Sequence, residues 1–300
     1  MKQQFDERNR DLVVGINDTL VHRDQAGISP FDSAVQGGDA VWEGLRLHGG
    51  RIFKLTEHLA RLRRSAHALA FVTVPSDAEI IERIRAVLEA NAMTDDVHIR
   101  LTLTRGVKVT SGMDPRLNES GPTLIVLAEF KSPVYDDSGI SLVTSSVRRH
   151  RPDSLDPKIH HNNLLTSILA KIEANVAGAD DALMLDDDGF VAETNATNVF
   201  HVVGDVVRTS TTRACPEGIT RETILEICDA TGIETSVGDF SLTDVYTADE
   251  VFVTGTMGGV TPVLAIDGRT IGAGRPGPYV AKLSAAYLAR TASEGTVVSG

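Results

Sequence analysis

Cysteine is scarce in this chain. Only Cys215 and Cys228 occur among its 300 residues, and they form neither a metal-ligand pattern nor a disulfide framework. So few thiols suit a reducing compartment. The polar first residues also carry no apolar run of the kind found in secretion signals. We therefore expect a cytoplasmic protein.

Basic side chains are fewer than acidic ones, and long apolar runs are missing. The 29 lysines and arginines against 41 aspartates and glutamates give a formal net charge of −12. Nucleic acids and anionic membranes bind clustered positive charge, so neither is expected as a partner. No apolar stretch reaches the roughly 20 residues that cross a bilayer. An anionic small molecule would have to be held by a few arginines and backbone N–H groups.

The length of the chain suits two modest domains. Segments typical of strands and helices occur in both halves, which predicts a mixed α/β (α+β) fold. A polar stretch with proline and glycine, residues 131–139, separates the halves. We place a linker at 134–139, between an N-terminal domain of residues 1–133 and a C-terminal domain of residues 140–300.

Three segments show the apolar spacing of amphipathic helices. The first covers 55–69, the second covers 78–90 with Ser76 as its N-cap, and the third covers 164–176 with Gly178 just beyond. The apolar stripe of the third consists of Leu164, Leu165, Ile168, Leu169 and Ile172. These helices would support the segments that carry chemistry.

Arg61 lies at the edge of the apolar stripe of the first helix. His58, Arg61 and Ser65 are spaced so that they share one side of the helix. A guanidinium in that position could bind a phosphate with several charge-assisted hydrogen bonds. The alternative is a solvated basic face shared with Arg63 and Arg64.

Two further segments could bind an anion through their backbone. Gly218-Ile219-Thr220 precedes a helix, whose first turn offers free N–H groups and a favourable dipole. Thr254-Gly-Thr-Met-Gly-Gly259 is a glycine-rich turn directly after an apolar strand. The alternatives are an ordinary threonine N-cap and a plain turn.

Two segments could supply acid–base groups. Glu193 lies among small polar residues between two strands, where a carboxylate could pair with a protonated ring nitrogen. The segment Asp156-Pro-Lys-Ile-His-His-Asn-Asn163 offers an amine and imidazoles that could act as nucleophile or proton carrier. The alternatives are an exposed loop acid and a polar loop that ends in an asparagine N-cap.

Taken in order, these segments resemble the class IV (fold-type IV) aminotransferases, which use pyridoxal 5′-phosphate. This family includes branched-chain and D-amino-acid aminotransferases. The resemblance runs from about Ile28 to Gly277. It includes the segments Val41–Arg46, Glu57–Leu62, Ala192–Phe200, Pro216–Arg221 and Thr254–Pro262. It implies a two-domain fold with the cofactor at the domain interface, a C-terminal domain that carries most cofactor contacts, and a homodimer.

The resemblance also implies roles for individual residues. Arg61, Ile219, Thr220 and Thr256 would contact the cofactor phosphate, and Glu193 would pair with the pyridine nitrogen. The backbone N–H groups of Met257 and Gly258 would meet the substrate carboxylate. Arg100 falls where some branched-chain enzymes carry a carboxylate-binding arginine, with a surface strand residue as the alternative.

The position of the lysine that holds the cofactor in this family does not carry lysine here. Alignment through Ile168–Ala174 places it at His160, and a variant with one extra residue places it at Ile159. Lys158 lies two positions upstream of His160. In an extended segment both would face the same side, roughly 6–7 Å apart. Either Lys158 replaces the usual lysine, or His160 occupies its place and moves protons without a covalent link to the cofactor.

The function expected from these features is that of a pyridoxal-phosphate-dependent aminotransferase. Its partners would be a small-molecule amino donor, either an amino acid or an amine, and a 2-oxo acid acceptor. Two alternatives stay open because of the lysine position. One is a lyase that uses the same cofactor, and the other is a cofactor-binding homologue without transaminase activity.

Overall fold

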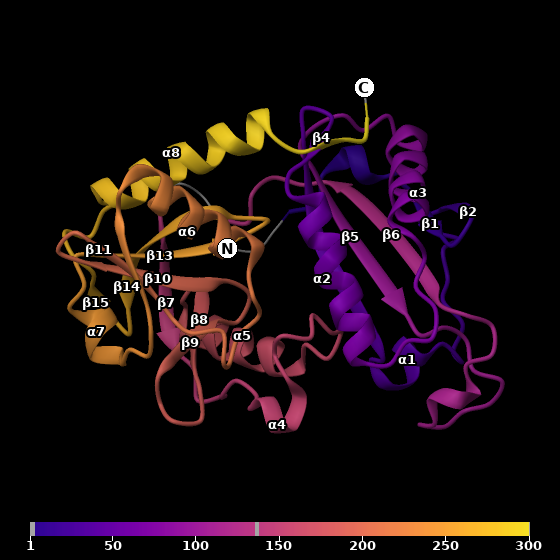
Figure 1. Ribbon diagram of the computed structural model, residues 1–300, viewed down its shortest axis with the longest axis horizontal. Coiled ribbons are helices and arrows are strands. Elements are labelled where there is room, and N and C mark those ends of the chain that lie inside the picture. Colours follow the sequence, from indigo (N-terminus) through magenta and orange to yellow (C-terminus); the bar gives the residue numbers. More distant parts are fainter. Residues whose placement is uncertain (1–3, 136–137, 300) are drawn as a thin grey trace. The chain divides into compact units, whose positions relative to one another are not determined.

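The computed structural model describes residues 4–135 and 138–299, which form two compact units (Figure 1). The N-terminal unit comprises the described residues up to Ser132, the short segment Ile159–Asn163 and the described residues from Thr291 onward. The C-terminal unit comprises the described residues from Pro133 to Lys158 together with Leu164–Arg290.

This division differs from the single boundary that the sequence suggested. The chain changes units after Ser132, and two later segments return to the N-terminal unit. They return because they add backbone hydrogen bonds to strands of that unit, which composition does not reveal. Residues 136 and 137 of the expected linker lie outside the described residues.

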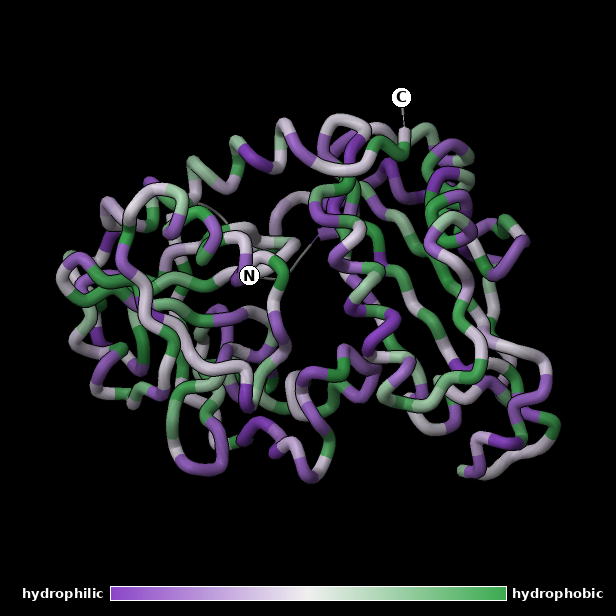
Figure 2. The backbone as a smooth tube through the Cα atoms, in the orientation of Figure 1, coloured by the Kyte–Doolittle hydropathy of each residue, from purple (hydrophilic) through white to green (hydrophobic). Residues whose placement is uncertain are grey.

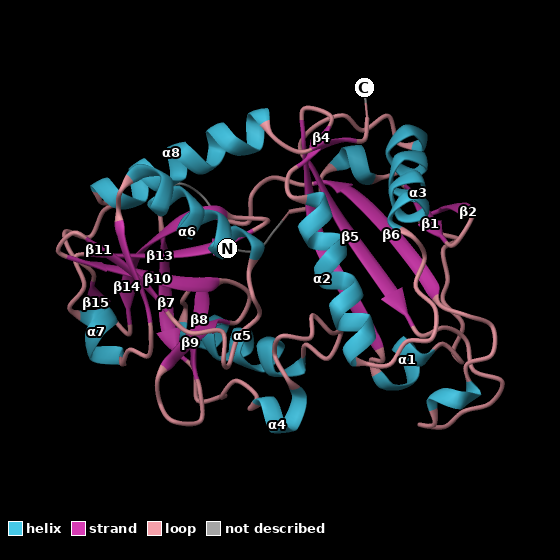
Figure 3. Ribbon diagram, in the orientation of Figure 1, coloured by secondary structure: helices cyan, strands magenta, loops and turns pink. Residues whose placement is uncertain are grey.

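The N-terminal unit is built on a seven-stranded antiparallel sheet in the order β16-β4-β3-β5-β6-β1-β2 (Figure 3). Its strands are β1 (Val13–Ile16), β2 (Thr19–His22), β3 (Ala40–His48), β4 (Arg51–Ile52), β5 (Val97–Thr104), β6 (Thr123–Phe130) and β16 (Thr296–Val297). Its helices are α1 (Ser33–Gly37), α2 (Leu55–Ala68) and α3 (Asp77–Ala90), with 3-10 turns at Glu7–Asn9 and Pro115–Leu117.

Helices α2 and α3 close the core of this unit. The expected stripe of α2, with Leu55, Leu59 and Leu62, is buried in the same cluster as the apolar residues of β3, β5 and β6. Helix α3 begins at a capping box between Ser76 and Glu79, as the N-cap prediction indicated. Both helices carry hydrophobic and hydrophilic residues along their length (Figure 2). The contact between α2 and the sheet is apolar except where His58 and Arg61 of α2 meet Glu43 of β3.

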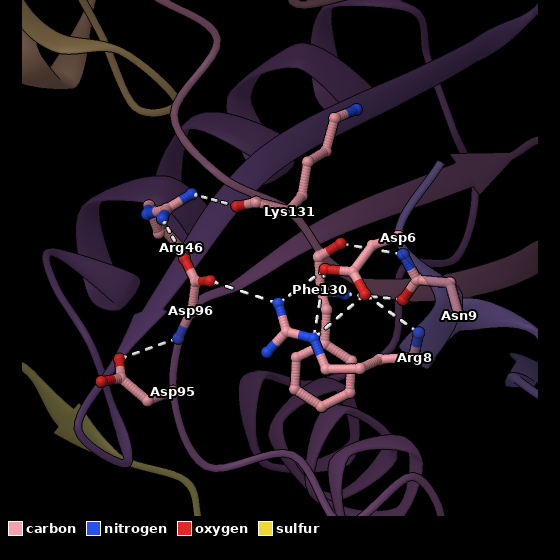
Figure 4. A network of polar contacts seen from close by, with 8 residues as sticks. All are labelled: Asp6, Arg8, Asn9, Arg46, Asp95, Asp96, Phe130 and Lys131. Atoms are coloured by element: carbon pink, nitrogen blue, oxygen red, sulfur yellow. Dashed lines mark hydrogen bonds and ion pairs between the residues drawn. The ribbon is translucent and has the colours of Figure 1, made fainter. Parts of the chain in front are cut away.

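A polar network holds the ends of β3, β5 and β6 together (Figure 4). The amide of Asn9 exchanges two hydrogen bonds with the backbone of Phe130, at 2.8 and 2.9 Å. The guanidinium of Arg46 donates to the Asp96 carboxylate at 2.8 Å and to the Lys131 carbonyl at 2.9 Å. Because Arg46 is buried, this pairing satisfies a charge that would otherwise be costly to bury.

The C-terminal unit contains a mixed sheet in the order β12-β11-β10-β13-β14-β7-β8-β9, with β15 paired to β14. Its strands are β7 (Ile140–Thr144), β8 (Asp181–Leu185), β9 (Val191–Thr194), β10 (Asn198–Val203), β11 (Val206–Thr209), β12 (Glu234–Val237), β13 (Glu250–Gly255), β14 (Gly259–Ile266) and β15 (Arg269–Thr270). Its helices are α4 (Pro152–Leu155), α5 (Leu165–Ala177), α6 (Ile219–Thr231), α7 (Leu242–Tyr246) and α8 (Pro278–Ser293), whose last residues belong to the N-terminal unit.

Helix α5 presents its apolar stripe to solvent rather than to the sheet. Its small residues Ala170 and Ala174 are fully buried and pack in one cluster with Ala182 and Met184 of β8. The larger aliphatic side chains are exposed, namely Leu165, Ile168, Leu169, Ile172 and Val176, at 72, 52, 51, 51 and 85%. The helix therefore packs close to its own sheet and leaves a row of apolar side chains uncovered. Among the described residues, no helix is long and apolar enough to cross a membrane.

Candidate functional site

The residues predicted from the sequence divide between the two units. Arg61, Arg100 and His160 lie in the N-terminal unit. The C-terminal unit holds Lys158, Glu193, Ile219, Thr220, Thr256, Met257 and Gly258. Each unit therefore carries its own set of candidate groups.

Glu193 lies on β9 and its side chain is buried. It pairs with Met184 of β8 across the sheet and forms an ion pair with Arg149. The carboxylate oxygen Oε1 is buried and lies against the Nη2 atom of Arg149. Because this carboxylate is buried and ion-paired, the alternative of an exposed loop acid does not apply.

Arg149 is a site residue that the sequence did not reveal. Its guanidinium also donates to the Ser167 hydroxyl at 3.1 Å, and burial lowers its pKa to about 10. The only feature of the sequence that could have pointed to Arg149 is the run of basic residues after β7, from Arg148 to Arg151. Nothing in that run says which arginine points inward, because the choice depends on where β9 places Glu193.

Ile219 and Thr220 form the first turn of α6. The N-cap is Gly218, and no side chain caps the turn. A Cβ atom on Gly218 would lie 1.9 Å from the Asn198 Oδ1 atom, so only glycine fits there. Thr220 is buried. The turn thus has the uncapped N–H groups that favour an anion.

Thr256, Met257 and Gly258 form the turn that joins β13 to β14. Gly259 follows with φ +58°, and the Thr261 hydroxyl donates to the Gly258 carbonyl at 3.0 Å. At the end of β13, the hydroxyl of Thr254 is buried without a hydrogen-bond partner among the described residues. The turn is tight and lies directly after this unpartnered hydroxyl, which could donate to an anion at the turn.

Arg61 lies on the inner side of α2 and is buried. Its Nε and Nη2 atoms donate to the two carboxylate oxygens of Glu43 on β3, at 2.9 and 2.7 Å. His58, one turn earlier, approaches the same carboxylate at 2.7 Å through its Nδ1 atom. Burial opposes ionisation of Glu43, but the neighbouring Arg61 charge holds its pKa well below the usual range. Arg61 is therefore no part of a solvated basic face.

His160 belongs to a segment that pairs with the edge of β3. The backbone N–H of Trp42 donates to the His160 carbonyl at 3.0 Å, and the N–H of Asn162 donates to the Ala40 carbonyl at 2.9 Å. The His160 ring stacks on the Trp42 ring with centroids 4.2 Å apart, and its Nδ1 atom lies 2.5 Å from the Trp42 carbonyl. A carbonyl only accepts, so Nδ1 carries the proton. Burial and the nearby Arg61 charge lower the His160 pKa, which favours the neutral ring.

Arg100 lies on β5 and also stacks on the ring of Trp42. Its guanidinium carbon is 3.5 Å from the Trp42 ring centroid, and Nη2 donates to the Asn162 Oδ1 atom at 2.8 Å. Burial lowers the Arg100 pKa to about 10. It is a partly buried residue with defined contacts rather than a surface strand residue.

Lys158 lies in a turn, not in an extended segment. Its side chain is 47% exposed, and Nζ is 3.9 Å from a carboxylate oxygen of Glu217. Its backbone N–H donates to the Asp156 carboxylate at 2.9 Å, and His161 N–H donates to the Ile159 carbonyl at 2.8 Å. These local bonds bend the chain, so the expectation that Lys158 and His160 share one side of a strand is wrong.

Comparison with known proteins identifies the family of this chain. Residues 40–266 match the family described as Amino-transferase class IV. The chain is 54% identical over 291 residues to branched-chain-amino-acid aminotransferase-like protein 2 of Arabidopsis thaliana, and the match covers 97% of this chain and 52% of the plant protein. It is 35% identical to the branched-chain-amino-acid aminotransferase of Pseudomonas aeruginosa, with 93% of each chain covered.

Solved structures show the same fold. One is a branched-chain amino acid aminotransferase in complex with N-(5′-phosphopyridoxyl)-L-glutamate, at 33% identity and a TM-score of 0.87. The match covers 94% of this chain and 95% of that one. The fold is thus that of the fold-type IV enzymes. This chain belongs to the class IV aminotransferase family, and it spans about half the length of the plant relative.

Proposed function

We propose that this chain is a pyridoxal-phosphate-dependent aminotransferase that moves an amino group between an amino acid or amine and a 2-oxo acid. The observation that carries the proposal is the Glu193 carboxylate, which is buried on β9, is ion-paired to Arg149, and occupies the position that the family resemblance assigns to the partner of the pyridine nitrogen. Family membership and the related aminotransferase bound to a phosphopyridoxyl amino acid support it.

The groups present fit pyridoxal phosphate. Glu193 would accept a hydrogen bond from the protonated pyridine nitrogen. The phosphate would be held by N–H groups of Ile219 and Thr220, by Thr256 and by the guanidinium of Arg61. When bound, the cofactor supplies a ring that withdraws the electron pair released at the substrate Cα. The ion pair with Arg149 favours the ionised form of Glu193, which is the form that pairs with a pyridinium.

We assign the covalent attachment of the cofactor and the movement of the Cα proton to Lys158. It is the only amine of the two candidates, and it shares a unit with Glu193, Thr220 and Thr256. It also lies beside Glu217, which directly precedes the glycine at the start of α6. His160, by contrast, has its Nδ1 proton directed at a backbone carbonyl of the N-terminal unit.

Borohydride reduction of the cofactor-loaded protein, followed by peptide mass spectrometry, tests this assignment. We expect a pyridoxyl adduct on the peptide that contains Lys158, because the reduced link to an amine is permanent. The adduct should be absent in K158M and present in the matched control K131M. Bound cofactor without any lysine adduct would overturn the assignment and support a site that uses His160.

A coupled assay then separates the reaction classes. With branched-chain L-amino acids, D-alanine and simple amines as donors, an aminotransferase needs a 2-oxo acid acceptor for turnover. Product formation without an acceptor would indicate a lyase. Cofactor binding with no turnover of any donor would indicate the binding homologue.

The substrate carboxylate would be bound by Arg100 and by the backbone N–H groups of Met257 and Gly258. Arg100 has its guanidinium plane set by Trp42 and Asn162, so it presents a fixed donor group. The Gly258 position is narrow, because an added Cβ would lie 2.9 Å from the Tyr135 ring. These features suit a small amino acid and its 2-oxo acid as partners.

We also propose a homodimer, with the exposed stripe of α5 as part of its interface. Five aliphatic side chains at helical spacing form this stripe, and an uncovered apolar row of this kind is typical of interaction surfaces. A second copy of the chain offers an identical row, which suits a symmetric interface. The two cysteines are buried and unpaired, which supports our proposal of a cytoplasmic location.

A further inference from the structure

Glu43 is a buried carboxylate with an unusual number of donors around it. Its side chain has no solvent exposure, and it meets the guanidinium of Arg61 and the Nδ1 atoms of His58 and His160. The distances to the carboxylate are 2.7 Å for Arg61 and His58 and 3.5 Å for His160. All four side chains belong to the N-terminal unit. The carboxylate therefore balances a buried cation and orients two imidazoles.

The contact with Arg61 is side-on. Both oxygens of Glu43 bind the edge formed by Nε and Nη2, at 2.9 and 2.7 Å. Two parallel hydrogen bonds fix the plane of a guanidinium and the direction in which its Nη1 group points. A single hydrogen bond would leave the group free to rotate. Glu43 therefore determines the orientation in which Arg61 meets an anion.

We propose that Glu43 is a positioning residue for the phosphate contact of Arg61. This inference rests on the proposed function, because it takes the bound anion to be the phosphate of the cofactor. Glu43 holds Arg61 pre-oriented, so the arginine loses little side-chain entropy when the phosphate binds. It also keeps the buried arginine charge compensated when the phosphate is absent.

The inference predicts an effect that depends on the phosphate group. We compare binding of pyridoxal 5′-phosphate with binding of pyridoxal, which lacks the phosphate, by absorbance and by the fluorescence of Trp42, the single tryptophan. E43Q keeps the size of the side chain but cannot accept from both nitrogens of Arg61. We expect about tenfold weaker binding of the phosphorylated ligand and little change for pyridoxal.

A matched control removes a similar ion pair elsewhere in the same unit. Asp39 accepts from Nε and Nη2 of Arg105 at 2.6 and 3.0 Å, and neither residue is a predicted site residue. D39N should leave the ratio of the two affinities unchanged. In the double variant E43Q/R61A, the ratio of the two affinities should equal the ratio measured for R61A alone. The second substitution adds nothing because Glu43 acts through Arg61.

The outcomes separate the inference from the proposed function. Wild-type protein that binds neither ligand would overturn the proposed function. If E43Q has the same ratio of affinities for pyridoxal 5′-phosphate and pyridoxal as the wild type, while R61A binds the phosphorylated ligand more weakly, only the role of Glu43 is overturned. If E43Q does not fold, E43D keeps the charge but withdraws the carboxylate from the guanidinium edge. E43D must then bind pyridoxal 5′-phosphate more weakly than the wild type while its binding of pyridoxal is unchanged. If E43D binds both ligands as tightly as the wild type, the inference is overturned.

Discussion

The ion pair of Glu193 and Arg149 joins two nearly buried charges, one on the edge strand β9 and one in the loop after β7. The side chains are 4% and 11% exposed. Removing one member of a buried pair leaves an uncompensated charge, and the cost is large because water does not reach it. Loss of either partner would therefore destabilise the C-terminal unit.

We predict that R149M destabilises the folded chain by about 3–5 kcal/mol, because it strands the Glu193 carboxylate in the interior. Urea unfolding followed by circular dichroism measures this change. R151A is the matched control, because the Arg151 side chain is 59% exposed and forms only surface ion pairs. Such pairs contribute ~0–1 kcal/mol to the free energy of unfolding. A loss for R149M no larger than that for R151A would contradict the prediction.

The residue types of the site were readable in the sequence, whereas their partners were not. Glu193, Thr220 and Thr256 could be singled out because motif spacing fixes which residue carries which group. Glu43 and Arg149 could not, because their importance depends on contacts to residues far away in the chain. Arg61 illustrates both cases: its proposed phosphate role comes from the motif, and its carboxylate partner comes from the packing of α2 on β3.

At the scale of elements, helix α5 has the apolar pattern of a core helix, but its apolar face points to solvent rather than to the sheet. The stripe of Leu165, Ile168, Leu169, Ile172 and Val176 is exposed, while two alanines contact the sheet. Helical periodicity shows that a face is apolar, but it does not say what covers that face. Here the small residues allow the closer approach to β8.

We predict that I168E and I172E together shift the chain from dimer to monomer. A carboxylate on an apolar symmetric interface is buried twice without a partner, which disfavours association. Sedimentation equilibrium measures the mass of each variant. V72E is the control, because Val72 is 97% exposed outside the stripe and should leave the mass unchanged. A dimer of undiminished affinity in the double variant would exclude α5 from the interface.

At the scale of the whole molecule, the chain passes between its units several times. Segment Ile159–Asn163 pairs with β3, and β16 pairs with β4, so the N-terminal sheet uses residues from three stretches of sequence. Neither contribution is visible in a linear pattern, because each consists of backbone hydrogen bonds at a strand edge. The sequence therefore suggested one boundary where the structure has a more interleaved division.

We predict that a fragment of residues 1–132 does not fold into the native N-terminal unit. It would leave the edges of β3 and β4 unpaired and would lose the packing of Ile159 and Val298 on the core. Urea unfolding of the fragment, monitored by circular dichroism and Trp42 fluorescence, should lack the cooperative transition of the full chain. A transition with the same midpoint and slope would show that the later segments are dispensable.

The sequence by itself determined the family, three amphipathic helices with the Ser76 and Gly178 caps, and the candidate groups for phosphate, ring nitrogen and substrate. It could do so because local spacing and turn chemistry depend on neighbouring residues. Only the tertiary structure decided that Glu43 orients Arg61, that Arg149 pairs with Glu193, and that His160 stacks on Trp42 while Lys158 lies in an exposed turn. These contacts join distant parts of the chain, and their energy comes from burial and charge pairing that arise only on folding.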